Sequence, residues 1–130
     1  METHSKIRIL VVEDELLIAM MLQDIIADLG FLAVGPAMRL KDALDLIERE
    51  PIDGALLDIN LHGERVYPAA DILVQRGLPI VLCTGYGSAG DIPDRYAAVP
   101  RVAKPFDADE LRAIVVPLFA ARPRPPADAA

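Results

Sequence analysis

Four short apolar runs constrain the fold of this chain more than any other feature of its sequence. Each run is a few residues long, and a polar or charged residue follows it directly. The runs are Ile7–Val12, Ala55–Leu57, Ile80–Cys83 and Val102–Ala103. Such runs are typical of strands that are buried in a parallel sheet. Because sites in open α/β sheets form outside the carboxyl ends of the strands, the residues that follow these runs should meet at one edge.

Helical patterns alternate with the apolar runs along the chain. Strands are predicted at Ile7–Val12, Phe31–Val34 (ended by Gly35-Pro36), Gly54–Asp58, Ile80–Cys83 and Arg101–Ala103. Helices are predicted at Glu15–Leu29, Met38–Arg49, Pro68–Arg76 and from Asp107, which forms a capping box with Glu110, to about Phe119. This alternation predicts an α/β fold, a doubly wound five-stranded parallel sheet with helices on both faces and right-handed crossovers.

One segment interrupts the alternation. Between the fourth and fifth strands, Gly85, Gly87, Gly90 and Pro93 are poor helix-forming residues. A fourth helix in this segment is therefore expected to be short or frayed. Low local stability of this kind is typical of segments that switch conformation.

Length and composition indicate one globular domain. The chain has 130 residues, of which 53% are hydrophobic, enough for a single folded core. We expect residues 1–119 to form that domain, and residues 120–130, with three prolines and no periodicity, to be a disordered tail. The sequence has no membrane-length apolar stretch, no signal segment and a single cysteine, so the expected compartment is the cytoplasm. The net charge of −7 disfavours nucleic acid as a partner.

Three acids stand at the predicted edge of the sheet. Glu13 and Asp14 follow the first strand, and Asp58 ends the third. Like charges held side by side are costly unless a cation lies between them, and carboxylate oxygens suit Mg²⁺. Alone, Glu13 and Asp14 could belong to a solvated loop, and Asp58 could be a turn or helix-capping acid. Their common position at strand ends favours a metal site.

A hydroxyl and an ammonium group join these acids. Thr84 follows the fourth strand and Lys104 follows the fifth. A lysine beside Pro105 at a strand end could neutralise a phosphoryl oxygen as a point charge. Taken singly, Thr84 could satisfy a backbone group, and Lys104 could be a surface residue in a turn. The five residues together predict a site for a divalent cation and a phosphoryl group.

From about Lys6 to Phe119, the chain resembles the receiver domains of bacterial two-component response regulators. The resemblance rests on four segments in matching order, Val11-Val12-Glu13-Asp14, Leu56-Leu57-Asp58-Ile59-Asn60-Leu61, Cys83-Thr84-Gly85 and Lys104-Pro105-Phe106. It implies a flavodoxin-like sheet with strand order 2-1-3-4-5. It also implies a phosphoprotein of phosphorelay signal transduction, which is not an enzyme beyond its own phosphorylation and dephosphorylation.

The same resemblance implies a role for each acid. Asp58 would be the phosphoacceptor, and Glu13, Asp14, Asp58 and the backbone carbonyl of Asn60 would hold Mg²⁺. The phosphodonor would be a sensor histidine kinase or a histidine phosphotransfer protein. Phosphorylation would then switch interactions with a downstream protein, with no role for nucleic acid or membrane.

The resemblance further describes the phosphorylated state. Thr84 and Lys104 would each bind a phosphoryl oxygen, the Lys104–Pro105 peptide bond would be cis, and Tyr86 would shield the acyl phosphate from water. One position departs from the family pattern, because Arg101 stands three residues before the lysine, where most receivers carry a switch aromatic. With Cys-Thr-Gly-Tyr-Gly at residues 83–87 and a weak fourth helix, the chain is similar to the alphaproteobacterial FAT GUY subgroup, whose members are often single-domain.

Other classes of function compete with this interpretation. A Mg²⁺-dependent phosphohydrolase also uses a nucleophilic aspartate, but it usually carries a second acid two residues later, where this chain has Asn60. A degenerate interaction module is disfavoured by the intact set of five residues. A DNA-binding regulator is disfavoured because no output domain follows Phe119, so we expect a stand-alone receiver, monomeric or weakly dimeric. Leu16, Leu17 and Met20 should face outward from the first helix and form a docking patch for a kinase or a dimer interface.

Overall fold

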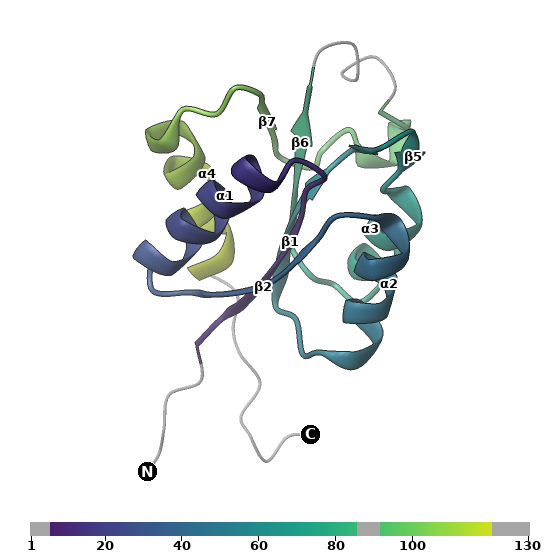
Figure 1. Ribbon diagram of the computed structural model, residues 1–130, viewed down its shortest axis with the longest axis horizontal. Coiled ribbons are helices and arrows are strands. Elements are labelled where there is room, and N and C mark those ends of the chain that lie inside the picture. Colours follow the sequence, from purple (N-terminus) through teal and green to yellow (C-terminus); the bar gives the residue numbers. More distant parts are fainter. Residues whose placement is uncertain (1–5, 86–91, 121–130) are drawn as a thin grey trace.

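Five parallel strands form the central sheet of the molecule (Figure 1). The structure, a computed structural model, describes residues 6–85 and 92–120. The strands are β1 (Arg8–Val12), β2 (Leu32–Ala37), β3 (Gly54–Asp58), β6 (Ile80–Thr84) and β7 (Arg101–Ala103). Their order is β2-β1-β3-β6-β7, and every neighbouring pair is parallel. Counted along the chain this is the order 2-1-3-4-5, so the predicted fold class is confirmed.

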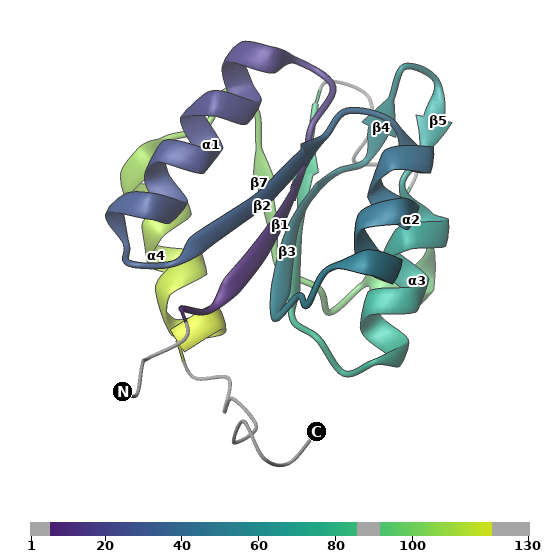
Figure 2. The same ribbon diagram turned by 60° about the horizontal axis from the view of Figure 1, so that its bottom comes forward.

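The α-helices cover both faces of the sheet. Within the described residues they are α1 (Leu16–Asp28), α2 (Leu40–Arg49), α3 (Tyr67–Gln75) and α4 (Ala108–Ala120). Figure 2 shows α1 and α4 on one face and α2 and α3 on the other. Ile9 and Val11 of β1 belong to the core on the α1 and α4 side, whereas Leu10 and Val12 belong to the opposite core. Because successive side chains of a strand point to opposite faces, a strand covered on both sides is apolar throughout.

The helix ends follow the predicted signals, and all predicted helix boundaries lie within two residues of those observed. Asp107 caps α4, where its Oδ1 accepts a hydrogen bond of 2.9 Å from the backbone N–H of Asp109. Gly30 and Gly77 follow α1 and α3 with φ of 87° and 76°. This left-handed conformation ends a helix and favours glycine.

The prediction that β2 ends at Gly35-Pro36 is wrong. The strand continues through both residues to Ala37, with a shift of register opposite Leu10 and Val12 of β1. A Cβ on Gly35 would lie 2.9 Å from the carbonyl oxygen of Val11, so the backbones approach too closely for any other residue. β2 is an edge strand, and proline is tolerated in edge strands and at bulges.

A small hairpin after β3 was not predicted. It pairs β4 (Asn60–Leu61) with β5 (Glu64–Arg65) in antiparallel fashion. His62 and Gly63 form its two-residue turn with φ of 52° and 90°, the pattern of a type I′ turn. The hairpin lies next to the carboxyl end of β3, where the sequence predicts the site.

The described residues between β6 and β7 contain little helix, as expected. Among these described residues, only Asp94–Tyr96 are helical, in a single 3-10 turn labelled η2. Tyr86 and residues 121–130 of the expected tail lie outside the described residues, whereas Ala120 belongs to α4. In the part of the chain that the structure covers, no helix has the length and apolar character needed to cross a bilayer.

Candidate functional site

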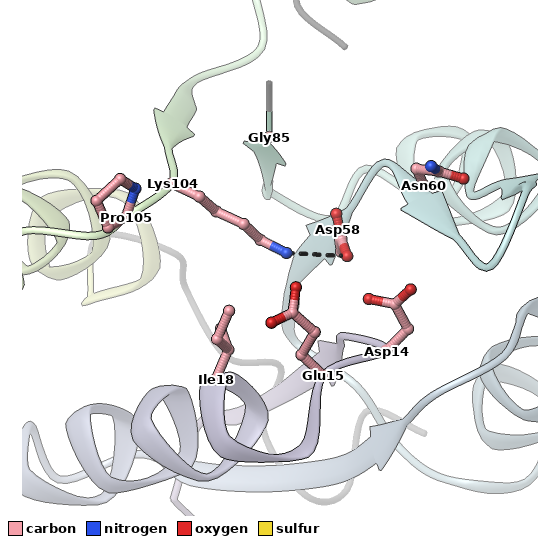
Figure 3. A pocket seen from close by; sticks show the side chains of 8 residues that line it. All are labelled: Asp14, Glu15, Ile18, Asp58, Asn60, Gly85, Lys104 and Pro105. Atoms are coloured by element: carbon pink, nitrogen blue, oxygen red, sulfur yellow. Dashed lines mark hydrogen bonds and ion pairs between the residues drawn. The ribbon is translucent and has the colours of Figure 1, made fainter. Parts of the chain in front are cut away.

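The carboxyl ends of the strands surround one pocket (Figure 3). β1 leads into Asp14, β3 ends at Asp58, and β7 is followed by Lys104. The residues that line the pocket are Asp14, Glu15, Ile18, Asp58, Asn60, Gly85, Lys104 and Pro105. The parallel topology therefore brings together residues that lie about ninety positions apart, as the strand-end argument predicted.

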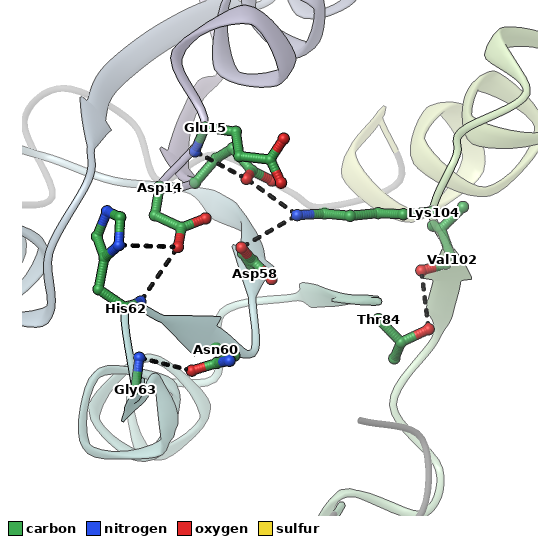
Figure 4. Close-up of polar contacts among 10 residues, drawn as sticks. Asp14, Glu15, Asp58, Asn60, His62, Gly63, Thr84, Val102 and Lys104 are labelled. Carbon is green, nitrogen blue, oxygen red and sulfur yellow. Dashed lines mark hydrogen bonds and ion pairs between the residues drawn. The ribbon is translucent and has the colours of Figure 1, made fainter. Parts of the chain in front are cut away.

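Lys104 joins the first and third strands through two partly buried ion pairs (Figure 4). Its Nζ lies 2.9 Å from Glu13 Oε2 and 3.1 Å from Asp58 Oδ2. Glu13 is fully buried and Asp58 is only 4% exposed. Buried carboxylates need such partners because removing an unpaired charge from water is costly. The peptide bond between Lys104 and Pro105 is cis, as the resemblance implies.

The three acids present a donor set suitable for a divalent cation. One carboxylate oxygen from each of Glu13, Asp14 and Asp58 lies within 4.8 Å of the other two. Among the described residues, Glu13 Oε1 is buried and has no hydrogen-bond partner. A buried oxygen without a partner calls for an ion, water or proton to satisfy it. The residues present thus fit a hard cation with oxygen ligands such as Mg²⁺.

The hairpin turn orients one of these acids. The backbone N–H of His62 donates a 3.1 Å hydrogen bond to Asp14 Oδ2, and the N–H of Gly63 donates one of 2.9 Å to Asn60 Oδ1 (Figure 4). The Asn60 side chain is thus engaged within the turn, while the residue lines the pocket beside Asp58. No local sequence signal could have revealed the contact to Asp14, because it joins a backbone amide to a side chain 48 positions away.

Burial controls the ionisation of the two most enclosed carboxyls. Removal from water raises the pKa of Glu13 to about 7 despite its hydrogen bond from Lys104, and it raises the pKa of Asp58 as well. Burial alone would lower the pKa of Lys104, but the hydrogen bond to Glu13 and the charge of Asp58 raise it. Burial likewise opposes ionisation of Asp14, yet hydrogen bonds with Asp58 and the His62 amide hold its pKa below the ordinary value. One lysine thus leaves the acids incompletely neutralised.

The Thr84 hydroxyl is turned away from the acids. It is buried at the end of β6, and its Oγ1 donates a 3.4 Å hydrogen bond to the carbonyl oxygen of Val102 in β7 (Figure 4). The backbone N–H of Lys104 donates to the Thr84 carbonyl at 2.8 Å, so both residues are placed by the same strand pair. A Cβ on Gly85 would meet no atom within 4 Å, which leaves the pocket open at this point.

Arg101, the departure from the family pattern, makes polar contacts with the η2 turn. Its Nη2 lies 3.3 Å from the carbonyl oxygen of Tyr96 and 3.4 Å from that of Ala97. Tyr96 is almost fully buried, and its ring stacks on Tyr67 of α3 at 5.2 Å between centroids. An arginine at this position therefore ties β7 to the turn that precedes it.

The η2 turn is also held to α3 by charge. Arg95 donates two hydrogen bonds, of 3.0 and 3.1 Å, to the carboxylate of Asp71, and the Tyr96 hydroxyl donates to the same group. The Arg95 guanidinium lies 4.8 Å from the centroid of the Tyr96 ring, a cation–π distance. The sequence reasoning missed this cluster, because its members belong to separate elements.

Comparisons with known proteins agree with this geometry. The family model for the response regulator receiver domain matches residues 9–116. The transcriptional regulatory protein PdtaR of Mycobacterium tuberculosis is 31% identical over 108 residues, which cover 80% of this chain but only 52% of that relative. Sporulation initiation phosphotransferase F of Bacillus subtilis is 30% identical over 112 residues, or 81% of this chain and 87% of the relative.

A solved structure extends the similarity to the fold. The solution structure of SdrG from Sphingomonas melonis has a TM-score of 0.77 and 38% identity, and the match covers 92% of this chain and 100% of SdrG. SdrG comes from an alphaproteobacterium, the group that the sequence resemblance indicated. Strand order, acidic pocket and family match agree, and the chain belongs to the response regulator receiver domains of two-component signalling.

Proposed function

We propose that this receiver domain accepts a phosphoryl group on Asp58 from a phosphohistidine of a sensor kinase or phosphotransfer protein. The observation that carries the proposal is the position of the Asp58 carboxylate. It lines the open pocket, yet it is only 4% exposed and is held by Lys104 at 3.1 Å. A nucleophile needs this combination of access from one side and fixed orientation from the other.

In the proposed reaction, an Asp58 carboxylate oxygen attacks the phosphorus atom in line with the departing imidazole nitrogen. A P–O bond forms, the P–N bond breaks, and its electron pair stays on the imidazole, which leaves neutral once it is protonated. Lys104 donates to the oxygens of the transferring group and offsets their charge. No group on the chain has to be oxidised or reduced.

Glu13, Asp14, Asp58 and the backbone carbonyl of Asn60 would hold a divalent cation, for which Mg²⁺ is the best fit to an all-oxygen donor set. When bound, the cation supplies positive charge to the phosphoryl oxygens and neutralises the acids around them. The unpartnered Glu13 Oε1 supports this assignment, because coordination would satisfy it.

Thr84 would report the phosphorylated state. To donate to a phosphoryl oxygen, its hydroxyl has to leave the Val102 carbonyl, so a bond between β6 and β7 changes when Asp58 is modified. Arg101 lies next to Val102 on the same strand and contacts the η2 turn. The proposed output is a shift of population at this end of the sheet, read by a protein partner.

We also propose that the catalysis is confined to the chain's own phosphorylation and dephosphorylation. Asn60 stands where aspartate-based phosphohydrolases usually carry their second acid, and its amide oxygen accepts a hydrogen bond from Gly63. An amide cannot act as the general acid or base for turnover of an external substrate. Measurable turnover of small phosphate esters would contradict this assignment.

The proposed partner surface lies on α1, beside the pocket. Leu16, Leu17 and Met20 are 55%, 81% and 50% exposed, as the sequence predicted. Ile18 of the same helix lines the pocket. Apolar side chains grouped beside a reaction site suit docking of the helices that present a phosphohistidine.

The test is intact-mass spectrometry after incubation with Mg²⁺ and a phosphodonor. Wild-type protein should gain one phosphoryl adduct, and the Asp58→Ala variant should gain none. Acetyl phosphate is the first donor, and a phosphorylated histidine kinase is the second. An adduct in both proteins would place the phosphoacceptor elsewhere, and no adduct from either donor would exclude the proposed reaction.

A further inference from the structure

Glu15 lines the phosphoacceptor pocket without a structural reason to be glutamate. It is the N-cap residue of α1 and is exposed, and within the described part of the chain its side chain makes no capping hydrogen bond. Short side chains such as serine or aspartate are preferred at this position, because they reach the free backbone N–H groups of the first turn. The Glu15 side chain is not needed to hold the Glu15 backbone in place, since the backbone N–H donates a 3.1 Å hydrogen bond to Glu13 Oε2.

The Glu15 carboxylate projects into the pocket. Figure 3 shows it on the same side as the Lys104 ammonium, between Ile18 and Asp14. The three acids whose oxygens converge within 4.8 Å are Glu13, Asp14 and Asp58, so Glu15 stands outside the set that suits a cation. Glu15 thus adds a negative charge to the approach to Asp58 that the proposed metal site does not use.

The negative charge of Glu15 decides whether the metal-loaded pocket carries a net formal charge. Among the described residues that line the pocket or contact Lys104, four carboxylates face one ammonium. A bound divalent cation and Lys104 together offset three of the four negative charges. The loaded pocket therefore keeps one formal negative charge, and without Glu15 it would be neutral.

We propose that Glu15 is a specificity determinant that disfavours small dianionic phosphodonors relative to a phosphohistidine presented by a protein. The inference rests on the proposed function of Asp58. A small donor such as acetyl phosphate has few contacts other than those of its phosphoryl group, so the repulsion acts directly on its rate of reaction. A protein donor can offset the same repulsion through contacts with Leu17 and Met20, which lie one and four positions further along α1 than Leu16 and are exposed.

The expected effect depends on the charge of the donor. When acetyl phosphate reacts, an Asp58 oxygen bonds to phosphorus, the P–O bond to the acetyl group breaks, and acetate leaves with the electron pair. Replacing Glu15 by glutamine should accelerate this reaction about three- to tenfold at low ionic strength, because a unit charge repels a dianion across a partly hydrated pocket. Phosphoramidate, whose protonated nitrogen makes it a monoanion, should gain clearly less.

The experiment compares rate constants of adduct formation at saturating Mg²⁺, measured by intact-mass spectrometry with both donors at low and high salt. Glu15→Gln is set beside Glu15→Asp, which keeps the charge, and beside Asp24→Asn. Asp24 is an exposed acid of α1 outside the pocket, and its substitution changes the net charge equally. We expect acceleration in Glu15→Gln alone, larger for acetyl phosphate and reduced by salt.

Several results would overturn the inference. An unchanged or slower rate in Glu15→Gln would do so, as would equal acceleration with both donors or acceleration by Asp24→Asn. A titration with Mg²⁺ alone provides a second readout, and a large loss of affinity in Glu15→Gln would make Glu15 part of the metal site. If wild-type protein accepts no phosphoryl group from acetyl phosphate, an adduct in Glu15→Gln supports the inference and its absence refutes it. Failure of the proposed function is distinct, because Asp58 would then remain unmodified in every variant and with a phosphorylated kinase.

Discussion

Without metal, the buried carboxyl of Glu13 should make the protein less stable as the pH rises. Glu13 is fully buried, and burial raises its pKa from 4.5 to about 7. Between these pH values the folded chain holds a proton that the unfolded chain has released, so the free energy of unfolding falls with increasing pH. A shift of this size corresponds to a loss of about 3 kcal/mol in the free energy of unfolding across the interval. Burial raises the pKa of Asp58 as well, which acts in the same direction.

The matched variant is Glu13→Gln, which keeps the shape of the side chain and cannot ionise. We expect it to remove most of the pH dependence and to be at least as stable as wild type at neutral pH in EDTA. Saturating Mg²⁺ should reverse this ranking, because the ion binds the ionised carboxylate of wild type and stabilises the folded state. The chain has no tryptophan, so urea unfolding is best followed by far-UV circular dichroism.

The reasoning would be refuted by stability that stays level or rises between about pH 5 and about pH 7 in wild type without metal. The reasoning would also fail if the free energy of unfolding of Glu13→Gln fell with pH as steeply as that of wild type, since a group other than Glu13 would then cause the pH dependence. Asp14 does not contribute to the pH dependence in this interval. Its pKa lies below the ordinary value of 3.8, so its contribution to stability is lost only at more acidic pH.

Three further predictions concern docking, packing and signal transmission. Alanine at Leu17 and Met20 should slow phosphoryl transfer from a kinase and spare the reaction with acetyl phosphate, and equal slowing of both reactions would argue against docking on α1. Gly54→Ala should lower the free energy of unfolding by about 1–3 kcal/mol through overpacking, because its Cβ would lie 2.7 Å from Phe119 Cε1; Phe119→Leu in the same chain should recover part of the loss in urea unfolding. Thr84→Val should still form the phosphoryl adduct by intact mass, but NMR shift changes in β7 on phosphorylation should shrink, and unaltered changes would remove Thr84 from the transmission route.

The contacts of the η2 turn with α3 bear on the absence of the usual switch aromatic from β7. Tyr96 is already buried against Tyr67, and Arg95 and Asp71 hold it there. Arg101 occupies the switch position but contacts backbone carbonyl groups of this turn instead of inserting a ring. Where most receivers carry the switch aromatic, this chain therefore has an arginine that connects β7 to the η2 turn through polar contacts.

The sequence alone determined the main elements and the ring of residues at the strand ends. β3 has the predicted bounds, because a strand buried on both faces needs a continuous apolar run that stands out from its surroundings. The edge strand β7 also has the predicted bounds, although only Val102 of its three residues is buried. The meeting of Asp58 with Lys104 could also be expected from the sequence, since parallel strands place their carboxyl ends at one edge whatever the details of packing.

Only the tertiary structure decided which atoms of these residues meet. The Gly35-Pro36 pair looks like a stop signal locally, but the edge position of β2 lets the strand continue through it. The His62 amide reaches Asp14 through a hairpin turn, and the Thr84 hydroxyl turns to Val102 on the neighbouring strand. Sequence patterns record the period and burial of each element, whereas these contacts depend on the distance and direction between elements, which are fixed only when the sheet and its helices pack together.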